Sequence, residues 1–241
     1  MNNLDLKKWD DGVGYYLGVL SETKDPFKKE IDTPRFLKLL GNVSGKSILD
    51  IGCGNGEFCR LLSSKGASVM GLDGSERMIA EAKKVCTNCV YVRCDLMSEV
   101  IPFEEDTFDI VTAKMLLMNI ASIPLVCKKI RRILKPGGIF AVDVVHPVRT
   151  ILKKYSKTSI KYDEDLDYFS EKRGEVNFQG AKFPFYYRPV EKYINDILSS
   201  GFQLDLIKET YITEEFVEKY PETEDKLRNP LTLHMVFRND K

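Results

Sequence analysis

Three glycines at alternating positions give the sequence its clearest candidate binding site. Residues 50–56, Asp-Ile-Gly-Cys-Gly-Asn-Gly, follow an apolar stretch and precede an amphipathic segment that starts near Glu57. Glycine allows the backbone to turn sharply and to approach a ligand without an intervening Cβ. The N–H groups at the start of the following helix attract a carboxylate or a phosphate. The G-x-G-x-G spacing differs from the G-x-G-x-x-G of dinucleotide-binding sites.

Two aspartates follow the next two predicted strands. Asp73 ends residues 68–73, and Asp95 comes directly after residues 90–94. Because the carboxyl ends of parallel strands meet at one edge of a sheet, we expect both carboxylates to lie near the glycine segment. A carboxylate after the second strand can accept hydrogen bonds from both hydroxyls of a ribose. An acceptor at Asp95 suits an adenine amino group, so this edge is predicted to bind a nucleoside.

Alternating strands and helices must position these residues. Helical periodicity predicts helices at about 57–65, from Ser75 onward, at about 123–134 and at 190–200. Strands are predicted at residues 47–51, 68–73, 90–94, 108–113 and 139–145, with two late strands near 203–212 and 231–237. This alternation is typical of a mostly parallel sheet that is covered by helices on both faces.

The order of these motifs resembles the class I S-adenosylmethionine-dependent methyltransferases. The resemblance covers about residues 45–145 and is carried by residues 48–56, 71–73, 94–96, 108–111 and 132–138. It implies an α/β, doubly wound, seven-stranded, mostly parallel sheet of order 3-2-1-4-5-7-6, with the last strand in the chain antiparallel. It also implies S-adenosylmethionine as the cofactor and in-line transfer of its methyl group to a small-molecule acceptor. Nitrogen or oxygen is the expected receiving atom, and carbon is the less favoured one.

The resemblance assigns the adenosine part of the cofactor to residues after the second and third strands. Asp73 would hold the ribose, with Gly74 and Met78 near the adenine. Asp95 and Leu96 would contact the adenine amino group and ring.

The methionine part of the cofactor is assigned to three other segments. Lys114 and Met115, after the fourth strand, would face its amine through their backbone. Tyr16 would reach its carboxylate, with neighbouring Tyr15 as the alternative. The glycine segment would line the same end with Gly52, Cys53 and Gly54.

Two segments outside the alternation are expected to cover this edge. Residues 1–44 form a predicted N-terminal flap, and residues 147–187 form a predicted inserted lid within one domain spanning 1–241. The insert holds nine aromatic residues, about twice the 10% share in the whole chain. It follows the fifth strand, where open α/β sheets bind ligands, and long inserts are often lids. The alternative is a small satellite core of aromatic side chains.

Three residues are candidates for catalysis or acceptor binding. His146 ends the fifth strand, and an imidazole with a pKa of about 6.5 suits a base; the alternative is a residue that hydrogen-bonds its own loop. Residues 186–189, Tyr-Tyr-Arg-Pro, resemble the Tyr-His-Arg-Pro of a small-molecule subgroup, with Tyr187 in place of the histidine. Arg188 could pair with an acceptor carboxylate or bridge to Glu191.

The charge balance argues against nucleic acid and membrane partners. The 241 residues include 36 basic and 36 acidic side chains. The basic run 128–135 alternates with apolar residues, which favours a solvated helix face over an RNA contact. The longest apolar run, 139–145, is too short to cross a bilayer. A small-molecule acceptor is therefore the expected partner, with an RNA- or protein-directed enzyme or a non-catalytic cofactor-binding module as alternatives. The expected oligomeric state is a monomer or a homodimer.

The six cysteines all lie between residues 53 and 127. This spacing is unlike that of small secreted scaffolds, so reduced thiols and a cytoplasmic location are expected. The first residues also lack the apolar core of a signal peptide. Cys86, Cys89 and Cys94 suggest zinc, but a structural site needs four ligands, usually in two pairs. No metal is predicted.

Overall fold

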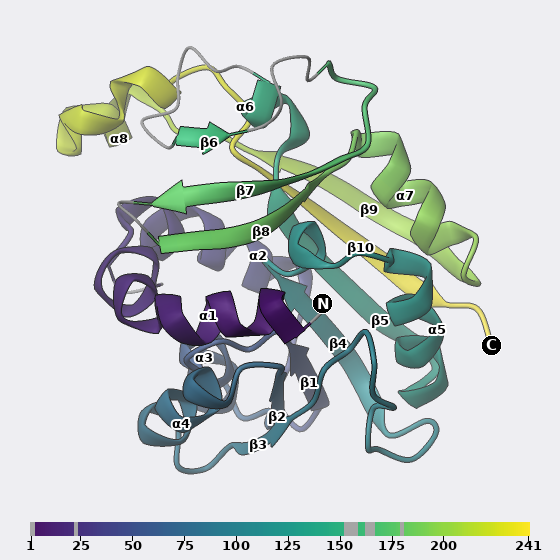
Figure 1. Cartoon of the computed structure of the whole chain (residues 1–241). Coiled ribbons are helices and arrows are strands. Elements are labelled where there is room, and N and C mark those ends of the chain that lie inside the picture. Colours follow the sequence, from purple (N-terminus) through teal and green to yellow (C-terminus); the bar gives the residue numbers. More distant parts are fainter. Residues whose placement is uncertain (1–2, 22–23, 152–158, 162–166, 179–180) are drawn as a thin grey trace.

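The computed structural model describes residues 3–21, 24–151, 159–161, 167–178 and 181–241. A seven-stranded sheet of order β3-β2-β1-β4-β5-β10-β9 runs through the molecule (Figure 1). Strands β1 to β5 are parallel, and β10 is antiparallel to both β5 and β9. The predicted strand order is confirmed. The strands are β1 (Ser47–Ile51), β2 (Ser68–Asp73), β3 (Val90–Arg93), β4 (Phe108–Lys114), β5 (Leu134–Val145), β9 (Phe202–Thr210) and β10 (Thr232–Asn239).

Amphipathic helices bury both faces of the sheet. Helices α2 (Thr33–Leu39), α3 (Glu57–Ser64) and α4 (Glu76–Val85) pack on one face around Phe36, Phe58 and Ile79. Helices α5 (Ile123–Ile133) and α7 (Val190–Leu198) pack on the other face. Because both faces are covered, β1 and β4 are almost wholly buried. Within the described ranges, no helix is both long enough and apolar enough to span a membrane.

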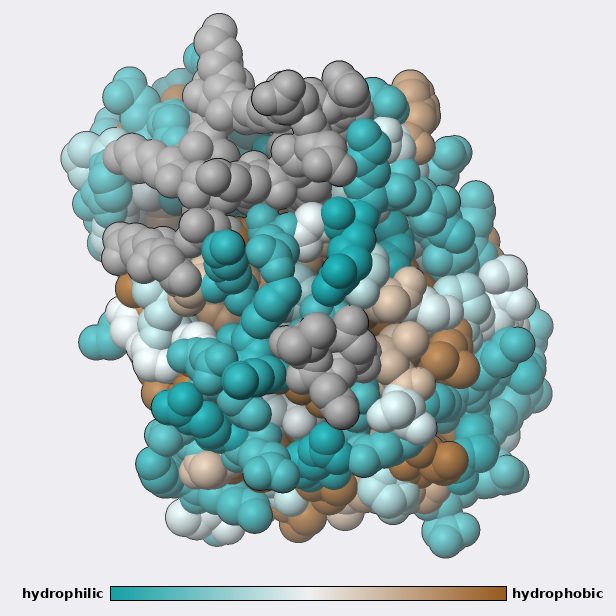
Figure 2. All heavy atoms as spheres, viewed as in Figure 1, coloured by the Kyte–Doolittle hydropathy of each residue, from teal (hydrophilic) through white to brown (hydrophobic). Residues whose placement is uncertain are grey.

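The basic side chains of α5 tie neighbouring loops to the sheet. Lys129 donates to the carbonyls of Leu96 and Glu99 at 2.6 and 2.7 Å, and Arg132 donates to Ile101 at 2.7 Å. Arg131 donates to the carbonyls of Gly201 and Asp240. Lys128 is exposed, as expected for a solvated face, whereas Lys129, Arg131 and Arg132 are half-buried and satisfy carbonyl oxygens of adjoining loops. Figure 2 shows that hydrophilic residues predominate on the described part of one face of the molecule.

The N-terminal helix and the insert form one joint cover. A second sheet, β6 (Ser159–Lys161), β7 (Lys172–Phe178) and β8 (Ala181–Tyr187), arches over the carboxyl edge of the main sheet, with α1 (Asn3–Tyr15) beneath it (Figure 1). The Trp9 and Phe183 rings lie 4.4 Å apart. A Cβ at Gly12 would meet the Phe183 ring at 2.5 Å, so glycine permits this close packing. Tyr155 and Tyr162 of the predicted lid lie outside the described residues.

A third group of short elements closes the end of the edge near β5 and β10. These are η1 (Tyr16–Leu20), η2 (Lys28–Asp32), α6 (Pro147–Ile151), α8 (Glu214–Lys219) and η5 (Pro221–Lys226). Phe27 packs with Ile212, Phe216 and Leu231 in a small apolar cluster. This cluster fixes residues 24–28 against the C-terminal segment, and both segments contribute to the cavity described below.

The structure corrects the expectation that all cysteines are reduced. Cys86 and Cys89 form a disulfide, with Cα atoms 5.5 Å apart. The turn between α4 and β3 brings the two thiols within bonding reach, which is the separation that disulfides require. Cys94, the third residue considered for zinc, is buried as a free thiol, as are Cys53, Cys59 and Cys127.

Candidate functional site

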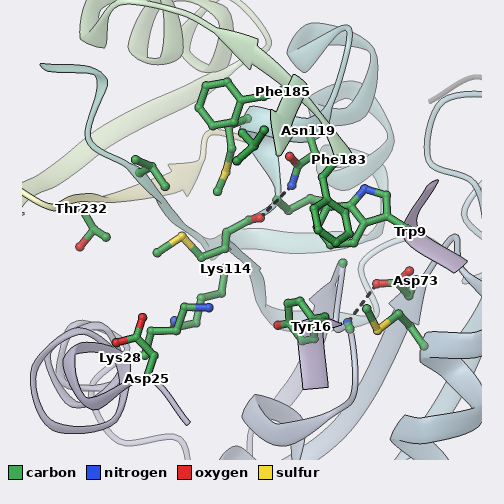
Figure 3. Close-up of a pocket in the computed structure, with 18 of the residues that line it drawn as sticks. Trp9, Tyr16, Asp25, Lys28, Asp73, Lys114, Asn119, Phe183, Phe185 and Thr232 are labelled. Atoms are coloured by element: carbon green, nitrogen blue, oxygen red, sulfur yellow. Dashed lines mark hydrogen bonds between the residues drawn. The ribbon is translucent and has the colours of Figure 1, made fainter. Parts of the chain in front are cut away.

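A cavity of about 360 Å³ lies between the carboxyl edge of the main sheet and its cover. This volume is in the range of small-molecule sites. Every residue predicted to bind the cofactor lines it except Cys53: Tyr16, Gly52, Gly54, Asp73, Gly74, Met78, Asp95, Leu96, Lys114 and Met115. Figure 3 shows residues from the N-terminal segment, the main sheet and β8 converging on this space.

The glycine segment adopts a conformation that other residues rarely reach. Gly52, Gly54 and Gly56 have φ angles of 67°, 53° and 77°. A Cβ at Gly52 would meet Leu116 at 2.6 Å, while Gly54 opens toward the Tyr16 hydroxyl. The Cys53 side chain packs into the core instead, and burial raises the pKa of its thiol. The prediction that Cys53 lines the cofactor site is therefore corrected, since its side chain belongs to the core.

Asp73 joins the glycine segment to the start of α4. Its two carboxylate oxygens accept hydrogen bonds from the backbone N–H groups of Gly54 and Ser75, at 2.9 and 2.8 Å. Figure 3 shows the Asp73 bond to the glycine segment at the edge of the cavity. Burial raises the pKa of Asp73, and these backbone donors oppose that shift. Each oxygen keeps a further lone pair, so the carboxylate can also accept from a ligand hydroxyl.

Asp95 is oriented by its own loop. One oxygen accepts from the Met97 N–H at 3.0 Å, and the other accepts from the Ser98 hydroxyl at 2.8 Å. Burial favours the neutral acid, but these donors outweigh it and lower the pKa of Asp95. The cavity wall therefore presents an ionised carboxylate at Asp95 beside the apolar side chain of Leu96.

The turn after β4 is held in a strained conformation. Met115 has a φ angle of 54°, which is uncommon for a residue with a Cβ. Its N–H donates to the carbonyl of Asp143 at 2.8 Å, and its carbonyl accepts from the Asn119 side-chain amide at 3.1 Å. Strain of this kind concentrates at binding sites, where the surrounding structure maintains it.

The Lys114 side chain belongs to a buried charge cluster that the sequence analysis missed. Its Nζ lies 2.9 Å from Asp32 Oδ2 and 3.4 Å from Asp143 Oδ2. His234 Nε2 lies 2.9 Å from Asp32 Oδ1, and the Thr232 hydroxyl donates to the same oxygen at 2.6 Å. Asp32, Asp143 and His234 are close enough to hold a metal ion, but the Lys114 ammonium already lies against both carboxylates.

The two carboxyl groups of this cluster differ in protonation. Burial opposes ionisation of Asp32, but Lys114 and His234 outweigh it and lower the pKa of Asp32 below its ordinary value. Burial and the neighbouring charge of Asp32 raise the pKa of Asp143 to about 7. Near neutral pH the cluster therefore exchanges a proton at Asp143 while Asp32 stays ionised.

We expect Asp143→Asn to remove a pH dependence of stability. The pKa of Asp143 rises from 3.8 when unfolded to about 7 when folded, so the native state retains a proton that the unfolded chain loses. The stability contributed by that proton is fully present below pH 4 and is lost as the pH rises through 7. At about 1.4 kcal/mol per pH unit, the variant gains about 2–3 kcal/mol on the parent protein between pH 5 and 8. Urea unfolding at a series of pH values measures this gain, and parallel curves for the two proteins would contradict it.

The structure does not place His146 in the cavity. The side chain is 2% exposed, and its Nδ1 accepts from the Val148 N–H at 3.2 Å. Its Nε2 therefore carries the proton and donates to Glu209 at 2.8 Å. Burial lowers the pKa of His146, with Glu209 opposing the shift. We withdraw His146 as the candidate base, because its ring is fully used in closing the turn after β5.

Tyr187 and Arg188 also point away from the cavity. The Tyr187 hydroxyl donates to the carbonyl of Tyr168 at 3.0 Å, and the side chain is 1% exposed. Arg188 donates to three carbonyls in the turn after β4, those of Leu117, Ile120 and Ala121, at 3.3, 2.6 and 2.9 Å. Arg188 was predicted to pair with an acceptor carboxylate or with Glu191, but it donates to carbonyl oxygens of the chain instead. Both residues support the cover and the wall of the cavity.

We expect Arg188→Met to lower the free energy of unfolding by about 2–3 kcal/mol, because buried carbonyls are left without donors. Met keeps much of the apolar packing of the arginine stem, so the loss isolates the hydrogen bonds. Urea unfolding measures the effect. An unchanged unfolding midpoint would contradict the assigned role.

We expect His146→Gln to change the affinity for S-adenosylhomocysteine by less than about twofold, because the ring lies outside the cavity. The loss of the Glu209 contact should lower the free energy of unfolding by about 1 kcal/mol. Calorimetric titration and urea unfolding give the two values. A His146→Gln variant of normal stability that binds S-adenosylhomocysteine poorly would show that His146 does belong to the binding site.

The cavity continues past Lys114 into a charged chamber, which we call the outer chamber. It is lined by Asp25, Phe27 and Lys28 and by residues of α6, η5 and β10. In Figure 3, Asp25, Lys28 and Thr232 lie on the opposite side of Lys114 from Trp9 and Asp73. No motif marks this chamber in the sequence, because its residues come from short elements that are far apart in the chain. The residues that sequence reasoning missed are Asp25, Phe27, Lys28, Arg149, Glu222, Asp225, Lys226 and Thr232.

The fold and the cavity together define a protein class. The strand order, a left-handed glycine turn after β1 and carboxylates after β2 and β3 form a nucleoside-binding edge of the methyltransferase type. Residues 49–142 match the family described as a methyltransferase domain.

A crystal structure of an S-adenosylmethionine-dependent methyltransferase from Listeria monocytogenes is 31% identical, with a TM-score of 0.71. The match covers 86% of this chain and 97% of that one. The chain therefore belongs to the S-adenosylmethionine-dependent methyltransferases, with S-adenosylmethionine as cofactor.

Two curated relatives have narrower overlap. The demethylmenaquinone methyltransferase of Lactococcus lactis is 39% identical over 127 residues, which are 49% of this chain and 50% of that protein. The ubiquinone biosynthesis O-methyltransferase of Bradyrhizobium diazoefficiens is 34% identical over 115 residues, which are 46% of this chain and 45% of that protein. The similarity to these two relatives spans about half of their length.

Proposed function

We propose that the protein transfers the methyl group of S-adenosylmethionine to a nitrogen or oxygen atom of a small-molecule acceptor, with carbon less favoured. The observation that carries this proposal is one continuous cavity. Its inner part is lined by the predicted cofactor residues, and its outer chamber by charged side chains. The curated relatives named above act on small molecules, which supports an acceptor of this size.

The inner part of the cavity fits the cofactor. Asp73 and Asp95 retain lone pairs for a ribose and an adenine amino group. The indole N–H of Trp9 is buried and has no hydrogen-bond partner among the described residues, so it can donate to a ligand. The absence of a Cβ at Gly54 leaves room beside the Tyr16 hydroxyl. These are the donors, acceptors and space that such a ligand requires.

The residues of this chain contribute mainly by positioning. When bound, S-adenosylmethionine supplies an electrophilic methyl group on its sulfonium. The rigid glycine segment and the strained Met115 turn fix one reactant, and proximity and orientation account for much of the rate gain in such a reaction. Val176, Phe183 and Phe185 of the second sheet line the cavity and restrict the access of water.

The outer chamber also provides groups that can take up a proton. With His146 outside the cavity, the carboxylates of Asp25, Glu222 and Asp225 become the candidate bases. Asp225 Oδ1 is buried without a hydrogen-bond partner among the described residues. A carboxylate in this position can accept a proton from a hydroxyl or an ammonium group of an acceptor.

The test uses S-adenosylmethionine with a trideuteromethyl group. The full chain is incubated with this donor and a cell extract that has been separated into small molecules, RNA and protein. We predict saturable binding of S-adenosylhomocysteine by calorimetry and label in a compound of the small-molecule fraction. Label confined to RNA or protein, or ligand binding without label in any fraction, would overturn the proposal.

A further inference from the structure

Two cations of the outer chamber make no hydrogen bond or ion pair with the described residues. Arg149 on α6 and Lys226 on η5 both line the cavity and are at least partly buried. Across the described residues, neither side chain makes a hydrogen bond or an ion pair. Most other cations near the cavity are engaged; Lys114, for example, lies against two carboxylates. Desolvated cations are normally paired, so an unpaired couple on one cavity wall is unusual.

The two cations also act on each other. Burial lowers the pKa of Arg149, and burial together with the positive charge of Arg149 lowers the pKa of Lys226. Asp25 and Asp225 oppose both shifts, Asp32 also opposes that of Arg149, and Glu222 that of Lys226. None of these carboxylates forms an ion pair with either cation within the described structure. The other charged side chains that line the cavity here are Lys28 and Lys114. An anion between Arg149 and Lys226 would relieve both the repulsion and the desolvation.

We propose that Arg149 and Lys226 bind an anionic group of the methyl acceptor, either a carboxylate or a phosphate monoester. This inference rests on the proposed function and names the class of its substrate. The planar guanidinium of arginine bonds two oxygens of such a group at once, and the lysine ammonium adds a compact charge. Because both cations line the same cavity as the cofactor residues, no wall separates the anchored acceptor from the methyl donor.

The choice of an anion over an amine as the ligand depends on which charged side chains of the chamber already have hydrogen-bond partners. An amine would need free carboxylates, and Asp25, Glu222 and Asp225 are present in the chamber. Asp25 already accepts from the Phe27 N–H at 2.9 Å, however, whereas Arg149 and Lys226 have all their donors available within the described structure. Among the carboxylates of the chamber, only Asp225 Oδ1 is buried without a hydrogen-bond partner in the described part of the chain. The two cations together offer several donors that make no hydrogen bond there, so we favour an anion.

The experiment measures the binding of inorganic phosphate and of benzoate to the full chain by calorimetry. The titrations are made at constant ionic strength, with and without saturating S-adenosylhomocysteine, and methylammonium serves as the amine probe. The variants are Arg149→Gln, Lys226→Gln and the double substitution. Lys208→Gln, an exposed cation on β9 outside the cavity, is the matched control.

We expect saturable binding of at least one anion, weakened tenfold or more by each single substitution and lost in the double variant. The two anions separate a carboxylate from a phosphate preference. Lys208→Gln should bind like the parent protein, and the affinity for S-adenosylhomocysteine should stay the same in all variants. Removal of these cations should not lower the unfolding midpoint, so a loss of binding would not be due to unfolding. The conservative variant Arg149→Lys should recover part of the binding.

Absence of saturable anion binding to the parent protein would overturn the inference. Binding that survives in the double variant, or saturable methylammonium binding in place of the anions, would do the same. Failure of S-adenosylhomocysteine to bind would instead contradict the proposed function. The two outcomes can be distinguished because the anion titrations are also made without S-adenosylhomocysteine.

Discussion

Replacement of Asp73 by alanine is expected to weaken S-adenosylhomocysteine binding by about a hundredfold or more. The carboxylate accepts from the Gly54 and Ser75 N–H groups, so its loss frees the glycine segment as well as removing the predicted ribose contact. Hydrogen bonds to a charged group contribute about 1.5–3 kcal/mol each. The loss of two such hydrogen bonds, about 3 kcal/mol or more together, corresponds to a hundredfold or larger change in the dissociation constant. Calorimetric titration of parent and variant measures it.

Asp10→Asn is the matched control for this prediction. Asp10 on α1 accepts from the Ser75 hydroxyl and the Arg77 N–H, close to Asp73, but it does not line the cavity. We expect its substitution to change the affinity by less than about threefold. Equal losses in Asp73→Ala and Asp10→Asn would mean that Asp73 acts only through the start of α4, with no ribose contact of its own.

Replacement of Asp32 by asparagine is expected to lower the free energy of unfolding by about 3–5 kcal/mol at pH 7, because buried Lys114 loses its shorter ion pair and keeps only the 3.4 Å contact to Asp143. Asp32 is fully buried and lies 2.9 Å from Lys114 Nζ. It also accepts from Thr232 and contacts His234. Urea unfolding gives the change directly.

Asp143→Asn is the comparison that makes the Asp32 prediction specific. Asp143 lies in the same cluster, but its raised pKa means that a neutral side chain suits the position below neutral pH. We expect Asp143→Asn to cost less than about 1 kcal/mol at pH 5, where the parent residue is protonated. Equal destabilisation by the two substitutions at pH 5 would contradict the assigned protonation states.

The parts of the fold that could be predicted depend on local signals. The glycine segment, Asp73 and Asp95 stand at the ends of apolar strands, so the inner cavity could be predicted from local spacing. The strand order was implied by the resemblance to the methyltransferase family. The start of β5 was predicted at Ile139, but the strand begins at Leu134. Residues 135–138 have no partner in β4, and Gly137 has a φ angle of 68°, so a turn interrupts the pairing between Leu134 and Ile139.

The parts that could not be predicted depend on distance in the sequence or on side-chain direction. Asp32 meets Thr232 and His234 across about two hundred residues, and no local pattern indicates such a contact. His146 directly follows β5 at the predicted edge, but its ring is bonded to Glu209 and does not line the cavity. Position at a strand end thus places a backbone, and the following turn decides where the side chain points.

The cysteine prediction was wrong for a different reason. It rested on how secreted proteins distribute their disulfides over a chain. The Cys86–Cys89 bond closes a single short turn, so the overall distribution of cysteines carries no information about it.

A crystal structure of the full chain with S-adenosylhomocysteine tests the central claim most directly. We predict that the ribose hydroxyls bond to Asp73, that the adenine lies against Leu96 with its amino group at Asp95, and that the sulfur faces the outer chamber. Density for the ligand elsewhere, or an adenosine that contacts neither carboxylate, would contradict the assignment of this cavity.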